Sequence, residues 1–397
     1  MPIVLSAADQ LRCEQVLSQC LETGGSIDQL MPFIRSELNG QCAGHVVALL
    51  GLQAKAVAKL GAGIWWCTER SLQQATPWQV AQQKSRWMPM GEVFDLCSGI
   101  GGDGVWLSRQ GDLVAIDCDP TMADMCEANL RLRGVNSTVR CADVLQQDIP
   151  TSAAIHIDPD RRPNEKRMTH AAGYLPPIDD VFALVGRQPA ALIKVAPAAE
   201  IESPIPMLRI WISLALSVRE QTLVCGQSID LAASDLGISM NGETRSAVMP
   251  RSAVMLSRDG QSSVYSGVPA TRISSVKQPL AFMLDIDPAI RAAGLTECFA
   301  GDHGAASLGA PSGFLTSGDP IAHPGVICES VVWSGSCDDR KLRRELRARK
   351  AYPRRVKTRG VDHNPNELEK RYRQCGDEPV TLWIGRAGEK RYAVITK

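Results

Sequence analysis

Short apolar runs alternate with helix-like segments through the middle of the chain. The runs of strand length are residues 93–96, 113–116, 154–157 and 191–195. This alternation predicts a parallel sheet covered by helices, because parallel strands are joined by helical crossovers. Two further apolar runs, 209–216 and 247–256, resemble the strands of β-hairpins. They predict an antiparallel edge on the same sheet.

The residues before this sheet predict helices. Apolar residues recur at near-helical intervals from Ala7 to Leu21, through Leu11 and Val16, and the pair Gly24-Gly25 then breaks the pattern. Near the end of this region, Thr76 followed by Pro77 predicts a helix start with Thr76 as the N-cap. We therefore expect a helical region over residues 1–88.

The character of the chain changes again after about residue 276. A short helix is predicted at 288–295, a basic helix at 338–352, and another helix where Asn364, Pro365 and Glu367 form a start signal. Two strands at 380–384 and 391–395 are predicted to be joined by a turn at 385–388. The predicted fold is α/β, with a helical N-terminal region at 1–88, a sheet domain at 89–276, and a linker with a small α+β domain at 277–397.

Composition adds few constraints. The 397 residues are 44% hydrophobic and 22% charged, and no apolar run approaches the roughly 18 residues of a membrane span. The N-terminus lacks the basic and apolar regions of a secretory signal, which predicts a cytoplasmic protein without a membrane partner. The 13 cysteines form no C-x-x-C pair and no Cys/His cluster at metal spacing, so no metal site is assigned.

The balanced net charge hides a segregation of charge. Residues 338–397 carry 18 Lys and Arg against 9 Asp and Glu, whereas residues 1–337 carry 25 against 34. Eleven of the basic residues lie within 338–360, where only three acids occur. A basic surface attracts phosphates by counterion release, so this segment predicts contact with a polyanion; a merely solvated face is the alternative.

A glycine loop between a strand and a helix carries the strongest chemical motif. Asp95 ends the first strand, and Gly99, Gly101 and Gly104 then satisfy G-x-G-x-x-G, which would also suit a dinucleotide. Asp95 would repel the pyrophosphate of a dinucleotide at the helix N-terminus. S-adenosylmethionine (SAM) instead carries an α-ammonium and a sulfonium there, and a carboxylate can contact these cationic groups directly or through water. The motif therefore predicts a SAM site contacted by Asp95, Gly99, Gly101 and Gly102.

Two further acids follow the next strands. Asp117 ends the second strand, 22 residues after Asp95, at the position of a carboxylate that binds both ribose hydroxyls. We expect Asp119 to cap the helix that Pro120 begins. Asp143 follows the third strand and is predicted to accept a hydrogen bond from the adenine amine, with a solvated turn acid as the alternative.

The fourth strand leads into Asp158-Pro159-Asp-Arg161-Arg162 at the edge of the sheet where ligands bind in open α/β folds. We expect Asp158 to hold the acceptor atom and Pro159 to stiffen this catalytic loop. Arg161 and Arg162 are predicted to receive a phosphate or carboxylate, with structural ion pairs as the alternative. His156, within the strand, is expected to be a core residue.

At these residues the chain resembles class I SAM-dependent methyltransferases over about residues 90–260. More narrowly, five segments are similar to bacterial methyltransferases that end in a THUMP-like domain, which extends the resemblance to nearly the whole chain. These segments are Leu72-Gln-Gln-Ala-Thr, Asp158-Pro-Asp-Arg-Arg, Ile193-Lys-Val-Ala-Pro, Asp287-Pro-Ala-Ile-Arg-Ala-Ala-Gly and Phe314-Leu-Thr-Ser.

The resemblance implies a Rossmann-like catalytic domain, SAM as cofactor, and a C-terminal module similar to RNA-binding THUMP domains. A tRNA or rRNA substrate contacted through the basic C-terminal region is the expectation. The Asp158 loop lacks the aromatic residue that many amino-group methyltransferases place there, which argues against methylation of a flipped base at an exocyclic amine. A small-molecule or protein acceptor, a non-catalytic RNA-binding factor and a NAD-dependent oxidoreductase remain alternatives.

Overall fold

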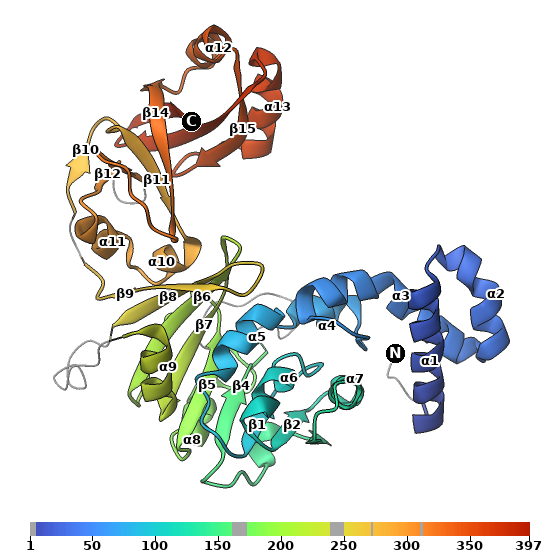
Figure 1. Cartoon of the computed structure of the whole chain (residues 1–397). Helices are drawn as coiled ribbons and strands as arrows, with labels where there is room; N and C mark the ends of the chain where they lie inside the picture. The colour runs from blue at the N-terminus through green and yellow to red at the C-terminus, as the bar shows by residue number, and fades with distance from the viewer. Residues whose placement is uncertain (1–4, 161–172, 239–249, 271–272, 310–312) are drawn as a thin grey trace. The chain divides into compact units, whose positions relative to one another are not determined.

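The computed structural model describes residues 5–160, 173–238, 250–270, 273–309 and 313–397. The chain forms two compact units (Figure 1). The first unit comprises Met1–Leu214, Arg219–Met249 and Arg258–Gly260, and the second comprises Ala215–Val218, Pro250–Ser257 and Gln261–Lys397.

The strands of the first unit follow the order β3-β2-β1-β4-β5-β7-β6. Strands β1 to β5 pair in parallel and β7 pairs with β5 in antiparallel orientation, so the predicted parallel sheet with an antiparallel addition is confirmed. The bounds are β1 Val93–Leu96, β2 Leu113–Asp117, β3 Ser137–Cys141, β4 Ala154–Ile157, β5 Ala190–Val195, β6 Met207–Leu214 and β7 Ser217–Gly226.

Strand β7 was not predicted as a strand. Its first half reads Ser-Val-Arg-Glu-Gln-Thr, and these polar residues conceal the period of a strand. Glu220, Gln221 and Thr222 are nevertheless buried, because β7 lies inside the sheet between β5 and β6. The reason for burying Glu220 is an ion pair described below.

The predicted helical N-terminal region is present, and it packs on the sheet domain. Helices α1 and α3 share one hydrophobic cluster with Trp65, Trp66 and residues of α7, so the predicted boundary at 88/89 falls inside the first unit. Gly24 ends α1 as expected, but Leu11 and Leu21 are exposed, because the buried face is formed by Cys13, Val16, Leu17 and Cys20. The helices here are α1 Ala7–Thr23, α2 Ile27–Glu37, α3 Gly40–Leu60, α4 Glu69–Gln74 and α5 Trp78–Ser85.

Helices connect the strands of the sheet. They are α6 Gly104–Leu107, α7 Pro120–Leu132, α8 Ile178–Val185 and α9 Ser228–Leu236. Asp119 caps α7 through its side chain, with Pro120 at the first helical position, as predicted. Within the ranges that the structure describes, no helix is both long and apolar enough to cross a membrane.

The second unit is a mixed α+β structure. Its eight-stranded sheet has the order β10-β12-β13-β11-β14-β17-β16-β15. The long strand β14 pairs with β11 through its first half and with β17 through its second half, with a register shift between Val331 and Trp333. Met283, Leu308, Phe314, Trp383 and Val394 form a core that joins strands from both ends of this sheet.

The elements of the second unit follow the predictions at several points. The run 247–256 contains β8, whose partner is β9, and α10 begins at Pro288 with Asp287 as its cap. The strand bounds are β8 Arg251–Leu256, β9 Ser262–Gly267, β10 Ser275–Val276, β11 Phe282–Ile286, β12 Ala306–Leu308, β13 Phe314–Ser317, β14 Val326–Ser336, β15 Ala351–Thr358, β16 Glu378–Ala387 and β17 Lys390–Thr396. The helices are α10 Pro288–Ala292, α11 Thr296–Asp302, α12 Asp339–Ala348 and α13 Pro365–Tyr372.

The predicted basic helix over 338–352 is too long. Helix α12 ends at Ala348, Lys350 adopts a positive φ of 50°, and the chain continues as β15. Pro353 argues against the predicted end at 352, since proline offers no backbone N–H and disfavours a helical conformation in the residue before it. The basic segment is therefore a helix followed by a strand.

Candidate active site

The glycine loop between β1 and α6 has the conformation that its sequence requires. Gly99 and Gly101 have φ values of +54° and +79°, which cost residues with a side chain roughly 1–2 kcal/mol. A Cβ added at Gly99 would meet nothing within 4 Å, so the loop faces open space there. A Cβ at Gly104 would lie 3.2 Å from the Asp95 Oδ2 atom, so this glycine lets α6 pack closely on β1.

The other two glycines of the predicted site face protein. A Cβ at Gly101 would lie 3.0 Å from the Cys126 sulfur on α7, and one at Gly102 would lie 3.5 Å from Leu60 at the end of α3. Gly101 and Gly102 therefore let the loop pack between helices, while Gly99 presents backbone to the open side.

Asp117 holds the glycine loop at the end of β2. Its Oδ2 atom accepts a hydrogen bond of 2.8 Å from the Gly99 N–H, and its Oδ1 atom accepts one of 2.9 Å from the Asp119 N–H. Burial raises the pKa of the Asp117 carboxyl, although both backbone donors oppose this change. A carboxylate offers about four acceptor positions, so two remain for a ligand with vicinal hydroxyls.

Asp143 lies close to Asp117 along the sheet edge. The Ala142 N–H, next to Asp143, donates to the Asp117 backbone carbonyl at 3.0 Å. The Asp143 side chain is exposed and caps a short 3-10 helix, Val144–Gln146, by accepting from the Leu145 N–H at 3.0 Å. Both carboxylates therefore lie at the carboxyl ends of neighbouring parallel strands.

Asp95 is buried beneath the loop rather than exposed to a ligand. Only 1% of its surface is accessible, and its Oδ1 atom lies 2.7 Å from His156 Nδ1, on the residue paired with it across β1 and β4. Burial raises the pKa of the Asp95 carboxyl, and the His156 hydrogen bond opposes this rise. His156 is a core residue, as predicted, and its Nε2 atom is free to accept from Lys84 Nζ at 3.1 Å.

Lys84 is the centre of a buried ion-pair network that the sequence analysis missed. It lies on α5, and its Nζ atom is 2.9 Å from Asp103 Oδ1 in the glycine loop and 3.1 Å from Glu220 Oε1 on β7. Burial alone would lower the Lys84 pKa, but the two carboxylates outweigh it and raise that pKa. A lysine is rarely buried, so no local pattern marks it in advance.

A second lysine contacts the predicted catalytic acid. Lys194 on β5 donates to Asp158 Oδ2 at 2.5 Å and to the Thr76 hydroxyl at 3.0 Å. The Lys194 side chain is 6% exposed and that of Asp158 is 27% exposed, so the carboxylate is the part that a ligand can reach. Thr76 was predicted as an N-cap, but α5 has no side-chain cap because this hydroxyl binds Lys194 instead.

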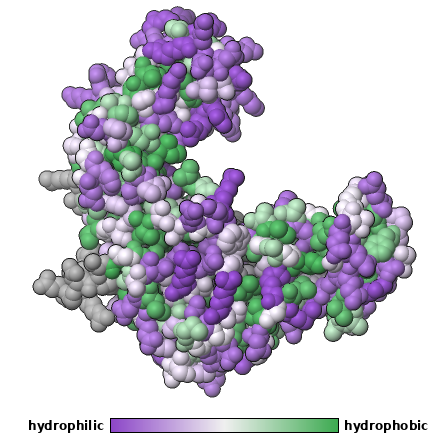
Figure 2. All heavy atoms as spheres, in the orientation of Figure 1, coloured by the Kyte–Doolittle hydropathy of each residue, from purple (hydrophilic) through white to green (hydrophobic). Residues whose placement is uncertain are grey.

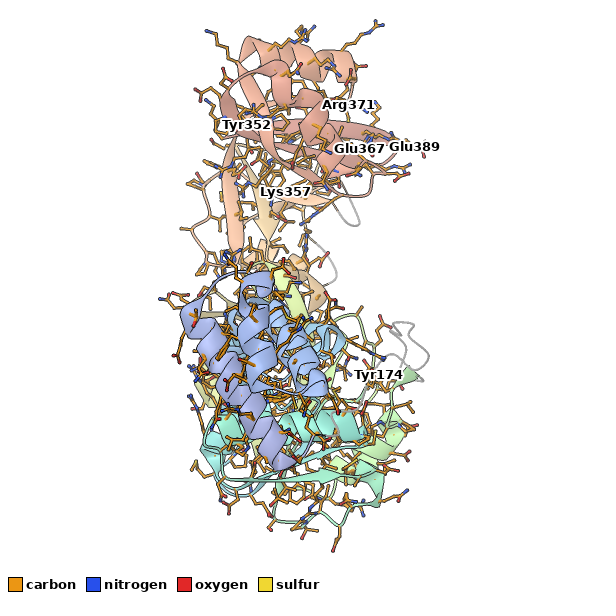
Figure 3. The ribbon with its side chains drawn as sticks, turned by 90° about the vertical axis from the view of Figure 1, so that its right-hand side faces the viewer. Tyr174, Tyr352, Lys357, Glu367, Arg371 and Glu389 are labelled. Carbon is orange, nitrogen blue, oxygen red and sulfur yellow. The ribbon has the colours of Figure 1, made fainter. Side chains whose placement is uncertain are left out.

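The rest of the predicted catalytic loop is described in part. Pro159 is buried, whereas Arg161 and Arg162 lie outside the described residues. The buried Tyr174 follows the loop, and its hydroxyl accepts from the Ala196 N–H at 2.8 Å just after β5 (Figure 3). Its ring belongs to the core of the sheet domain, so it is not placed to stack on an acceptor.

The residues at this sheet edge fit SAM. The open side of Gly99, the spare acceptor positions of Asp117 and the Asp143 carboxylate suit a nucleoside. In the described ranges, no three His, Cys, Asp or Glu side chains group as metal ligands.

Known proteins resemble the chain over most of its length. A SAM-dependent methyltransferase of Mycobacterium tuberculosis, itself uncharacterised, is 29% identical to the chain over 373 residues in each of the strains CDC 1551 / Oshkosh and H37Rv. The match covers 90% of this chain and 96% of the relative. No protein-family model matches the chain.

A solved structure shares the fold over the full length. A candidate methyltransferase from Porphyromonas gingivalis W83 superposes with a TM-score of 0.72 at 17% identity and covers 100% of this chain and 99% of its own. The fold of both units together with the N-terminal helices is therefore found in another protein.

Proposed function

We propose that this chain, which is a SAM-dependent methyltransferase with a class I fold, methylates RNA. The observation that carries the proposal is the basic surface of the second unit. Helix α12 buries Leu342 and Leu346 and presents Arg340, Lys341 and Arg347 to solvent. The space-filling view shows hydrophilic residues over this helix (Figure 2).

The acids of α12 neutralise only some of its cations. Arg343 pairs with Asp339, while Arg344 and Arg349 share Glu345. Among the described residues, no carboxylate pairs with Arg340 or Arg347. Uncompensated surface cations in the same chain as a catalytic unit support a polyanionic substrate, and a tRNA or rRNA bound by a THUMP-like second unit is the proposed partner.

For the cofactor, we propose contacts with Asp117, Asp143 and the backbone at Gly99. Asp95 supports the loop from beneath through its hydrogen bond with His156, and Gly101 and Gly102 allow the loop to pack closely against its neighbours. SAM, when bound, supplies a methyl group on a sulfonium, whose neutral thioether, S-adenosylhomocysteine, is a good leaving group. The chain needs to bind and orient the acceptor, to exclude water around it and to take up its proton.

The acceptor is assigned to the loop after β4. Asp158 accepts a hydrogen bond from the acceptor atom and takes up its proton, while Lys194 holds the carboxylate and is itself held by the Thr76 hydroxyl. Pro159 limits the freedom of the loop. Arg161 and Arg162 are proposed to receive a phosphate of the substrate.

Calorimetric titration with S-adenosylhomocysteine tests the cofactor assignment. We expect binding by the wild type and a loss of roughly 100-fold or more in Asp117→Ala, since two hydrogen bonds to a charged group are removed. Asp119→Ala is the control: it removes the α7 cap and costs about 1 kcal/mol of stability, yet should keep the affinity. Tighter binding of NAD would contradict the assignment.

The salt dependence of binding to bulk tRNA tests the RNA assignment. For Arg340→Gln/Arg347→Gln, we expect weaker binding and a log K against log salt slope that is shallower by roughly 1–2, because each lost phosphate contact removes about one unit. Arg12→Gln, an exposed arginine in the first unit, is the control. An unchanged slope in the double variant would instead favour a small-molecule or protein acceptor.

A further inference from the structure

The second unit contains a group of three cations around one carboxylate, here called the Asp285 cluster. It consists of Asp285, Arg291, Lys357 and Arg359. Asp285 Oδ1 lies 2.6 Å from an Arg359 nitrogen and 3.5 Å from an Arg291 nitrogen. Asp285 Oδ2 pairs with Lys357. The three cations and one carboxylate therefore give the cluster a net charge of +2.

Two distant stretches of the second unit bring these residues together. Asp285 is on β11 and Arg291 is on α10, while Lys357 is near the end of β15 and Arg359 directly follows it. Residues two apart in an extended chain share one face. Lys357 lies away from Glu367 and Arg371 of α13 (Figure 3).

The aromatic core orients the two cations of β15. The Arg359 guanidinium lies 4.5 Å from the centre of the Phe314 ring, and Lys357 Nζ lies 5.2 Å from that of Trp383. Arg359 also donates to the Gly313 carbonyl at 3.2 Å. The segments 287–294 and 314–317, singled out in the sequence, thus supply Arg291 and the Phe314 ring to this cluster.

Two of the three cations, Lys357 and Arg359, are largely enclosed by protein. The side chains of Arg359 and Lys357 are 12% and 17% exposed, and that of Arg291 is 38% exposed. Burial, and next the Arg291 charge, lower the pKa of Arg359 to about 10. Charges removed from water are costly without a partner, so the cluster would be stabilised by a further anion.

We propose that the Asp285 cluster binds the terminal phosphate of the RNA substrate, an inference that rests on the proposed function. A terminal phosphate carries about 1.5–2 negative charges at pH 7, which matches the excess of the cluster, whereas an internal phosphodiester carries only one. Two guanidinium groups offer paired N–H donors to phosphate oxygens. Arg291, the most exposed cation, is the first contact for the ligand.

Two oligoribonucleotides of identical sequence, one with a 5′-phosphate and one with a 5′-hydroxyl, test this site by calorimetry or anisotropy. We expect the phosphorylated RNA to bind the wild type about tenfold more tightly, and this preference to disappear in Arg291→Met and Arg359→Met. Arg354→Met, an exposed residue of the same strand, should keep the preference. Arg359 is nearly buried, so Arg359→Met risks destabilising the unit, and the result for Arg291→Met decides the test. Thermal unfolding checks that Arg291→Met is folded.

The outcomes distinguish a failure of the phosphate site from a failure of the proposed RNA substrate. Equal affinity for the two RNAs would overturn the phosphate site while leaving RNA binding intact. Binding of neither RNA, together with inorganic phosphate binding that Arg291→Met abolishes, would confirm an anion site but overturn its assignment to RNA and the proposed substrate with it. Absence of all three interactions would overturn both.

Discussion

Replacing Lys84 by methionine is expected to lower the free energy of unfolding by about 3–5 kcal/mol, the range for breaking a buried ion pair from one side. The ammonium group of Lys84 is the shared partner of Asp103 and Glu220, all three of which are buried. Methionine fills a similar volume but leaves two carboxylates without this cation. Because these groups join α5, the glycine loop and β7, we expect cofactor binding to weaken as well.

Chemical denaturation at neutral pH measures this loss. Lys55→Met is the matched control, because Lys55 is an exposed lysine of α3 whose distance to Glu69 is 3.8 Å. Surface pairs of this kind contribute about 0–1 kcal/mol, so the control should be close to the wild type. A loss in Lys84→Met no larger than that in the control would contradict the network.

The stability difference between wild type and Lys84→Met should also depend on pH, in a direction that follows from the Asp103 pKa. Burial alone would raise the Asp103 pKa, but Lys84 outweighs it, so that pKa is lowered in the folded protein. Asp103 therefore stabilises the wild type above its unfolded pKa of about 3.9, and this contribution is lost as the pH falls toward the folded pKa. Without Lys84, burial should raise that pKa instead. The stability difference between wild type and Lys84→Met should then shrink as the pH falls.

The sheet could be predicted from the sequence because its signals are local. The apolar runs of β1, β2, β4 and β5, the glycine loop and the Asp119-Pro120 helix start each lie within a few residues. The carboxyl ends of parallel strands meet at one edge, so the positions of Asp117, Asp143 and Asp158 at that edge follow from the strand assignments.

The partners of these residues could not be predicted in the same way. Lys84 and Glu220 are 136 positions apart, and Lys194 and Thr76 are 118 apart, so no periodicity connects them. Lysine and glutamate are also usually exposed, which made α5 and β7 look like surface elements. The same limit hid the Asp285 cluster, whose members come from two distant stretches of the chain.

Replacing Asp158 by asparagine is expected to reduce the methylation rate by roughly 10²–10⁴-fold, the usual contribution of a positioned proton acceptor. Asparagine keeps the shape of the side chain and a hydrogen bond to Lys194 but cannot take up a proton. Because the side-chain partner of Asp158 is Lys194, and Asp158 makes none of the contacts between Asp117 and Gly99, S-adenosylhomocysteine affinity should change little. Transfer of a labelled methyl group from SAM to bulk tRNA or rRNA measures the rate, and calorimetry measures the affinity.

Lys194→Met separates proton transfer from positioning. If Lys194 only fixes the carboxylate, its loss should lower the rate less than Asp158→Asn does, and the double variant should be no slower than Asp158→Asn, since residues that act as a unit are not additive. Asp148→Asn, an exposed acid in the same unit, should leave the rate unchanged. A parallel loss of rate and S-adenosylhomocysteine binding in Asp158→Asn, with thermal unfolding unchanged, would move Asp158 from the acceptor to the cofactor.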